Sequence, residues 1–189
     1  MMRSIRGTAS MALIAALLVS AHARGTTLKH MSVAQMTDAA DVILRARCLG
    51  STTGWDAGEI WTFTAFENEE AWKGEVGSRF TVRLLGGRAG NLTSSVAGVP
   101  RFHAGEDVVL FLETTGRGDY SIVSWVQGTF RIQRDRRTGG ESATQDTTDF
   151  ATFDPSTRRF QANGFRNMPL SALRAQVDAA QRDQAGRNQ

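Results

Sequence analysis

Cysteine is nearly absent from this chain of 189 residues, in which Cys48 is the only example. A lone cysteine excludes an internal disulfide, so the packed core alone must hold the fold together. Cys48 lies on the same alternating face as Val42 and Leu44, which favours a buried, small hydrophobic residue. A reactive thiol and a link between two chains are the alternatives.

Histidine is scarce, and motifs that would name a reaction are missing. The chain has 3 histidines and no HExxH sequence, whereas a zinc site needs three or four ligands at defined spacing. A serine-hydrolase elbow, a phosphate-binding P-loop and a dinucleotide fingerprint are also missing. The aspartates Asp146, Asp149 and Asp154 lack the spacing of a calcium loop. We therefore expect no cofactor, no bound metal and no recognised enzyme class.

Apolar runs are too short to span a bilayer. The longest, MALIAALLVS at residues 11–20, follows two arginines and precedes AHA, a small-x-small sequence that signal peptidase accepts. We expect a signal peptide over residues 1–23, cleaved between Ala23 and Arg24. The protein would then be periplasmic or extracellular, with no integral membrane segment after cleavage. A retained anchor is the alternative.

Net charge is also small once the signal peptide is set aside. The chain has 22 Lys+Arg and 19 Asp+Glu, and two arginines would leave with residues 1–23, so the exported part carries 20 basic against 19 acidic residues. A near-neutral domain has no long-range field to attract nucleic acid, and we expect no nucleic-acid partner. The alternative is a stacking face for single strands, made by Trp61, Phe63, Trp72, Phe80, Arg79 and Arg83.

The sequence does contain a succession of segments with strand periodicity. The first, residues 40–50, places Val42, Leu44, Ala46 and Cys48 on a core face, and Ile43, Arg45 and Arg47 on a face that is wet or at a partner. Further strands are expected at residues 60–72, 79–85, 107–113 and 120–126. Asn68-Glu69-Glu70 interrupts the second of them and predicts a bulge. Loops are expected at residues 51–59 and 86–106.

Two helices are expected at the ends of this β region. Ser32 and Gln35 have capping-box spacing, which predicts a helix over residues 33–39. Pro169 opens a second helix whose apolar residues recur at helical spacing as far as about Gln181. Residues 24–182 would form a single domain, and residues 183–189 a flexible tail.

This order of segments fits a mainly β protein, an OB-like five-stranded Greek-key barrel with a short N-terminal helix and a C-terminal helix. The string ADVILRA at residues 40–46 resembles the opening strand of the netrin-like module found in tissue inhibitors of metalloproteinases. AWKG at residues 71–74 resembles the end of that module's second strand. The similarity covers about residues 39–135. The chain also resembles a pattern common in uncharacterised exported bacterial proteins.

The resemblance implies a fold and does not imply inhibition. Those inhibitors chelate the catalytic zinc of proteases with an amino-terminal Cys-x-Cys. This chain would begin at Arg24 and has no cysteine there.

The region from residue 86 to residue 106 is the best candidate for a functional surface. It is rich in glycine and small polar residues, and long loops on a rigid scaffold often carry function. Arg88, Asn91, Arg101 and His103 offer hydrogen-bonding groups there. We expect an exported binding module that engages a protein partner, such as an envelope or secreted enzyme. A hydrolase that uses His103 with a nearby carboxylate, and a structural envelope protein without a discrete site, are the alternatives.

One tripeptide has two interpretations. Arg117-Gly118-Asp119 is a sequence that adhesion receptors recognise, and it falls at a predicted hairpin tip. The same residues are what a tight turn needs, so the turn is the simpler interpretation.

Overall fold

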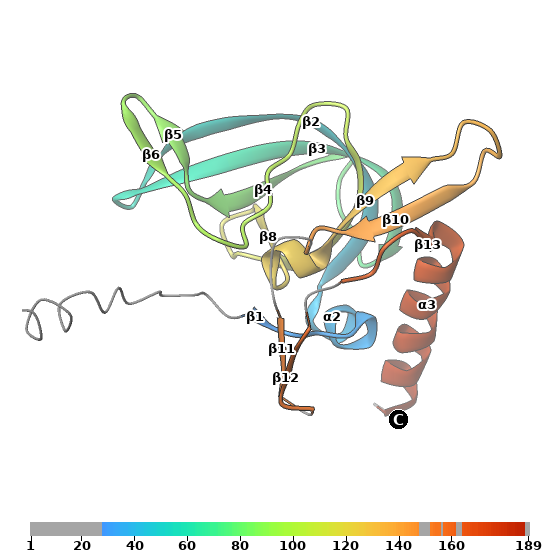
Figure 1. The fold of residues 1–189 in the computed structure, drawn as a ribbon. Coiled ribbons are helices and arrows are strands. Elements are labelled where there is room, and N and C mark those ends of the chain that lie inside the picture. The colour runs from blue at the N-terminus through green and yellow to red at the C-terminus, as the bar shows by residue number, and fades with distance from the viewer. Residues whose placement is uncertain (1–27, 148–151, 156, 162–163, 188–189) are drawn as a thin grey trace, which may run out of the picture.

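The computed structural model describes residues 28–147, 152–155, 157–161 and 164–187, so the predicted signal peptide and its cleavage site at Ala23 and Arg24 lie outside the described residues. The described chain is mainly β, with two helices packed beneath one end of a large sheet (Figure 1). No helix in these ranges is both long enough and apolar enough to cross a membrane.

The large sheet has eight strands, in the order β13-β10-β9-β7-β2-β3-β4-β8, and β8 pairs with both β4 and β7. Neighbours run antiparallel apart from β4 and β8, which are parallel. The strands of this sheet are β2 (Val42–Asp56), β3 (Glu59–Lys73), β4 (Arg79–Leu85), β7 (Asp107–Thr114), β8 (Tyr120–Ile122), β9 (Thr129–Arg134), β10 (Glu141–Gln145) and β13 (Met168–Pro169).

Strands β2 and β3 form one long hairpin that runs through the loop predicted at residues 51–59. The two strands pair up to Asp56 and Glu59, and only Ala57 and Gly58 form the turn. Both turn residues have positive φ, 51° and 84°, as a two-residue hairpin turn requires to match the twist of its strands. The loop prediction was therefore wrong, because an Ala-Gly turn of this kind is short enough to leave the strands paired.

The predicted bulge in β3 is confirmed. Arg45 pairs with Glu70 and Ala46 pairs with Asn68, which leaves Glu69 without an opposite residue on β2. An extra residue of this kind increases the local twist and bend of its strand.

The first half of β2 is buried on both faces. Val42, Leu44, Ala46 and Cys48 belong to one hydrophobic cluster, as predicted. Ile43 is 0% exposed and belongs to a second cluster that includes residues of both helices. The prediction of a wet face was wrong at Ile43, because the helices cover that end of the strand.

Helix α2 (Val33–Ala39) begins with the predicted capping box. The Ser32 hydroxyl accepts from the Gln35 amide at 3.2 Å, and the Gln35 side chain accepts from the Ser32 amide at 2.9 Å. Helix α3 (Leu170–Arg187) follows Pro169 as predicted but continues beyond Gln181. Residues 183–187 of the predicted tail are helical, and Arg187 forms an ion pair with Asp38 at 3.0 Å.

Two small sheets complete the described fold. The hairpin of β5 (Gly87–Ala89) and β6 (Leu92–Ser94) lies in the predicted long loop, and β1 (Leu28–Lys29), β11 (Thr152–Asp154) and β12 (Arg159–Gln161) form a three-stranded sheet.

The strand predicted over residues 120–126 ends at Ile122 and is followed by a 3₁₀ helix at Trp125–Gly128. Ser124 and Trp125 have φ of 50° and 52°, a left-handed conformation that no strand adopts.

Candidate functional site

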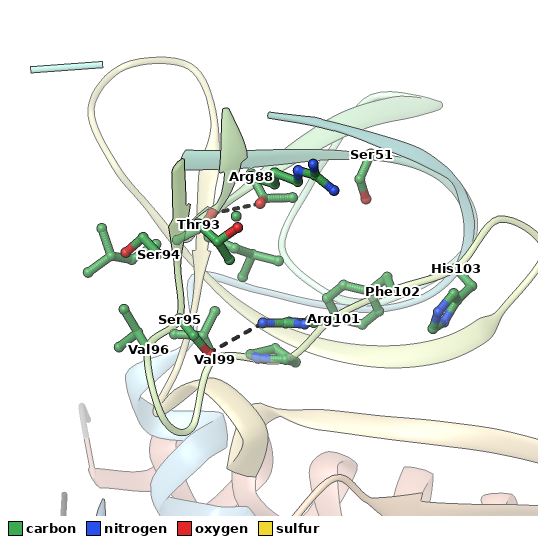
Figure 2. A pocket seen from close by; sticks show the side chains of 16 residues that line it. Ser51, Arg88, Thr93, Ser94, Ser95, Val96, Val99, Arg101, Phe102 and His103 are labelled. Carbon is green, nitrogen blue, oxygen red and sulfur yellow. Dashed lines mark hydrogen bonds between the residues drawn. The ribbon is translucent and has the colours of Figure 1, made fainter. Parts of the chain in front are cut away.

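A pocket of about 400 Å³ lies between the β5–β6 hairpin, the segment 95–103 and the strands β2, β3 and β4. We call it the arginine pocket, because Arg88 and Arg101 both line it, together with His103 (Figure 2). Of the four predicted site residues, the structure thus brings three together. Asn91 does not line the pocket and lies instead in the turn between β5 and β6.

The glycines of this region let the hairpin approach the large sheet closely. A Cβ atom on Gly87 would lie 2.5 Å from the Thr62 hydroxyl and 2.7 Å from the Thr53 methyl group. Because glycine has no Cβ, the Thr62 hydroxyl can donate to the Gly86 carbonyl at 2.7 Å, and the Thr53 hydroxyl donates to the carbonyl of Arg88. The hairpin is therefore fixed on β2 and β3, and Arg88 has a defined position.

The opposite wall is held by Arg131 on β9. Its guanidinium donates to the Arg101 carbonyl at 2.7 Å and forms ion pairs with Glu106 and Asp146. The next residue, Phe102, packs edge-on against Phe66 in the core, with a centroid distance of 5.1 Å. The backbone of Arg101 is therefore held by Arg131 at its own carbonyl and by the buried ring of Phe102.

His103 lies at the rim with 83% of its side chain exposed. Its Nδ1 is 3.0 Å from a carboxylate oxygen of Glu106. Burial raises the pKa of Glu106, but the hydrogen bond with His103 and the charge of Arg131 outweigh it and leave that pKa below its usual value. Glu106 is thus the carboxylate beside His103 that the hydrolase alternative calls for, and no described side chain forms a hydrogen bond with Nε2 of His103.

The two arginines of the pocket have weak partners. Arg88 donates to the Gly90 carbonyl at 3.4 Å, and Arg101 donates to the Ser95 hydroxyl at 3.3 Å. Neither forms an ion pair with any residue that the structure describes, and no aspartate or glutamate lines the pocket. Guanidinium groups form their strongest hydrogen bonds with carboxylates and phosphates. The pocket therefore has unused capacity for an anion.

A second hollow shows the opposite arrangement. It has a volume of about 500 Å³ and lies between β3, the β9–β10 hairpin and α3. Arg45 there pairs with Asp107 and Glu141, and Arg174 pairs with Glu70. Arg45 and Arg174 thus have carboxylate partners. Arg134 also lines this hollow, opposite Glu141 in the strand pairing, so carboxylates accompany the positive charge here, unlike in the arginine pocket.

The other sequence-based candidates are accounted for by internal contacts. Phe80 and Trp72 belong to separate buried clusters, and Arg83 covers the Trp61 ring at 3.9 Å, so the six residues do not form one stacking face. Arg117 forms an ion pair with Asp56 at 2.8 Å, and the Asp119 side chain is 15% exposed, which supports the turn interpretation of this tripeptide.

Sequence reasoning missed the hydroxyl groups of the pocket. These are Ser51, Thr62, Thr93, Ser94 and Ser95. Ser51 falls in the segment that was predicted as a loop, and Thr62 has no distinguishing signal in its own strand. Only the docking of the β5–β6 hairpin on the sheet brings them to one cavity.

Comparisons with known proteins leave these contacts as the basis for assigning a function. No protein-family model matches the chain, and no curated protein matches its sequence.

Proposed function

We propose that the protein is an exported binding module that engages a partner protein through the arginine pocket. The observation that carries the proposal is the pair Arg88 and Arg101, which line one cavity and have no carboxylate partner in the part of the chain that the structure describes. Two uncompensated guanidinium groups on a fixed backbone favour a bound anion, because charge-assisted hydrogen bonds are about twice as strong as neutral ones.

Exposed apolar residues beside the pocket support a protein as the partner. Trp55 on β2 and Leu92 on β6 are each 58% exposed. Their two hairpins meet at the hydrogen bond between Thr53 and Arg88, at one end of the sheet (Figure 1). Aromatic residues and arginine are the side chains most enriched in the energetically dominant parts of protein interfaces.

Strand pairing supports the finer fold assignment. β7, β2, β3 and β4 are consecutive neighbours, and β8 pairs with both ends of that series, at Val82↔Tyr120 on β4 and Leu112↔Ile122 on β7. We therefore propose a five-stranded OB-type barrel, of the kind that the netrin-like resemblance implies. Export also remains part of the proposal, through the predicted signal peptide.

Site-specific photo-crosslinking in the organism that encodes the protein tests the partner. A photoreactive residue at Ser95, on the pocket wall, should give a crosslinked protein of defined mass. The same residue at Arg136, in the turn between β9 and β10, is the matched control and should not give it. The crosslink should be lost when Arg88→Gln and Arg101→Gln are combined. An unchanged crosslink in that variant, or the same product from both positions, would overturn the proposed function.

A further inference from the structure

We infer that the arginine pocket receives the C-terminal carboxylate of the partner chain, and that the last residue of that chain is apolar. The inference rests on the proposed function and specifies what the pocket recognises. It follows from three properties of the pocket wall: its charge, its apolar portion and its free hydroxyl groups.

Arg88 and Arg101 are both exposed, and their charge favours an anionic group. Arg88 comes from the β5–β6 hairpin and Arg101 from the segment on the other side of the cavity (Figure 2). Within the described residues, each guanidinium donates one long hydrogen bond, from Arg88 to the Gly90 carbonyl at 3.4 Å and from Arg101 to the Ser95 hydroxyl at 3.3 Å. A carboxylate suits such a wall, since each of its two oxygens accepts charge-assisted hydrogen bonds from guanidinium groups.

The apolar portion requires more than a free inorganic ion. Leu84, Val96, Val99 and Phe102 line the same cavity as the arginines. Burying an apolar side chain against them is favourable in proportion to the area removed from water. A C-terminal residue carries its carboxylate and its side chain on one Cα atom, so a single residue can satisfy both parts of the wall. An internal acidic residue of an extended segment has neighbours that point to the opposite face.

The hydroxyl groups favour a peptide over an acyl chain. Thr93 and Ser94 line the pocket, and their side chains form no hydrogen bond with other described residues. An acyl chain would remove these hydroxyl groups from water without replacing their hydrogen bonds, which is unfavourable. The amide groups of a peptide can replace them. A peptide end therefore matches all three properties.

Calorimetric titration of the exported chain, residues 24–189, tests the inference. The probes are pentapeptides ending in Leu, Val or Phe with a free carboxylate. Each is compared with its C-terminal amide and with an amidated pentapeptide that carries an internal aspartate. We expect the free acids to bind at least about tenfold more tightly than either, because the charge-assisted hydrogen bonds are lost on amidation. Decanoate and inorganic phosphate test the other sources of an anion.

Two double variants complete the design. Arg88→Gln with Arg101→Gln should abolish the preference for the free acid. Arg136→Gln with Arg137→Gln, which removes the same charge from the turn between β9 and β10, should leave it unchanged. Thermal unfolding of each variant confirms that it is folded.

The inference is overturned if no free-acid peptide binds, if the amides bind equally, or if decanoate, phosphate or the internal aspartate binds more tightly. Its failure is distinguishable from failure of the proposed function, because the Ser95 crosslink measures partner binding without any assumption about the bound group.

Discussion

Replacing Arg45 by methionine should destabilise the fold substantially, since this side chain, on β2, contacts carboxylates on three other strands. From β2 its guanidinium donates to Asp107 on β7, at 2.5 and 3.1 Å, and to Glu141 on β10, at 2.9 and 3.0 Å. A carboxylate oxygen of Glu69 is also 3.4 Å away. The Arg45 side chain is 20% exposed, so these contacts are largely shielded from water.

The expected cost follows from what the substitution leaves behind. Methionine retains the apolar stem but removes the charge, so three carboxylates remain close together without their cation. Removing one partner of a buried ion pair typically costs 3–5 kcal/mol. Because the partners here are 19–28% exposed, we expect the lower end, about 3 kcal/mol in the free energy of unfolding. For a chain of this size that is a decrease of roughly 6–12 °C in Tm.

Urea unfolding at pH 7 measures this difference, with Arg47→Met as the matched control. Arg47 is on the same strand, is 47% exposed and forms one ion pair with the described residues, to Glu69 at 2.8 Å. An exposed pair of this kind contributes at most about 1 kcal/mol. If Arg45→Met cost no more than Arg47→Met, the reasoning that these contacts hold the strands together would be refuted.

The pH dependence provides an independent check. The hydrogen bond from Arg45 lowers the pKa of Glu141 from its usual 4.5, and burial opposes it. A lowered folded-state pKa stabilises the fold above the unfolded value, and this contribution is lost as pH falls through the folded value. Arg45→Met removes the contribution, so the difference between wild type and variant should shrink as pH falls from 7 to below 4.5.

Three further predictions concern residues away from the pocket. Burial raises the pKa of the Cys48 thiol, so a thiol reagent at pH 8 should label it rapidly only when the protein is unfolded; rapid labelling of the native chain would contradict a buried thiol. Gly74→Ala should lower the free energy of unfolding in urea by about 3 kcal/mol, because Gly74 has φ of 70° and an added Cβ atom would clash with the Asp41 carbonyl oxygen. Ser32→Ala should cost about 1 kcal/mol through loss of the N-cap, which urea unfolding also measures, and a wild-type value would contradict the capping role.

Local patterns predicted the local elements well. The capping box at Ser32 and Gln35, the strand that contains Cys48 and the bulge at Glu69 are each set by neighbouring residues, so they could be recognised in the sequence. Errors arose where a distant segment decides the outcome. Ile43 is buried because helices from both ends of the chain cover it, and no pattern within its own strand shows this.

The candidate site could be predicted only in part for the same reason. Composition identified the segment that carries Arg88, Arg101 and His103, but it could not show that Asn91 lies outside the pocket. Ser51 and Thr62, which also line the pocket, lie on β2 and β3, far earlier in the chain. Their participation depends on the close approach that Gly87 allows, which is a tertiary contact.

The pairing of β8 with β4 has a consequence for folding kinetics. A single residue pair, Val82↔Tyr120, joins these strands, while β2, β3 and β4 pair as successive hairpins. Local hairpins form early, because little chain entropy is lost in closing them, whereas strands separated by a long segment pair late. We expect the segment between β4 and β7, which forms the arginine pocket, to reach its final place after the hairpins. Pulsed hydrogen exchange should then show protection at Phe63 before protection at Gly105, whose amide donates to the Cys48 carbonyl on β2. The part of the molecule that meets the partner would be the last to fold.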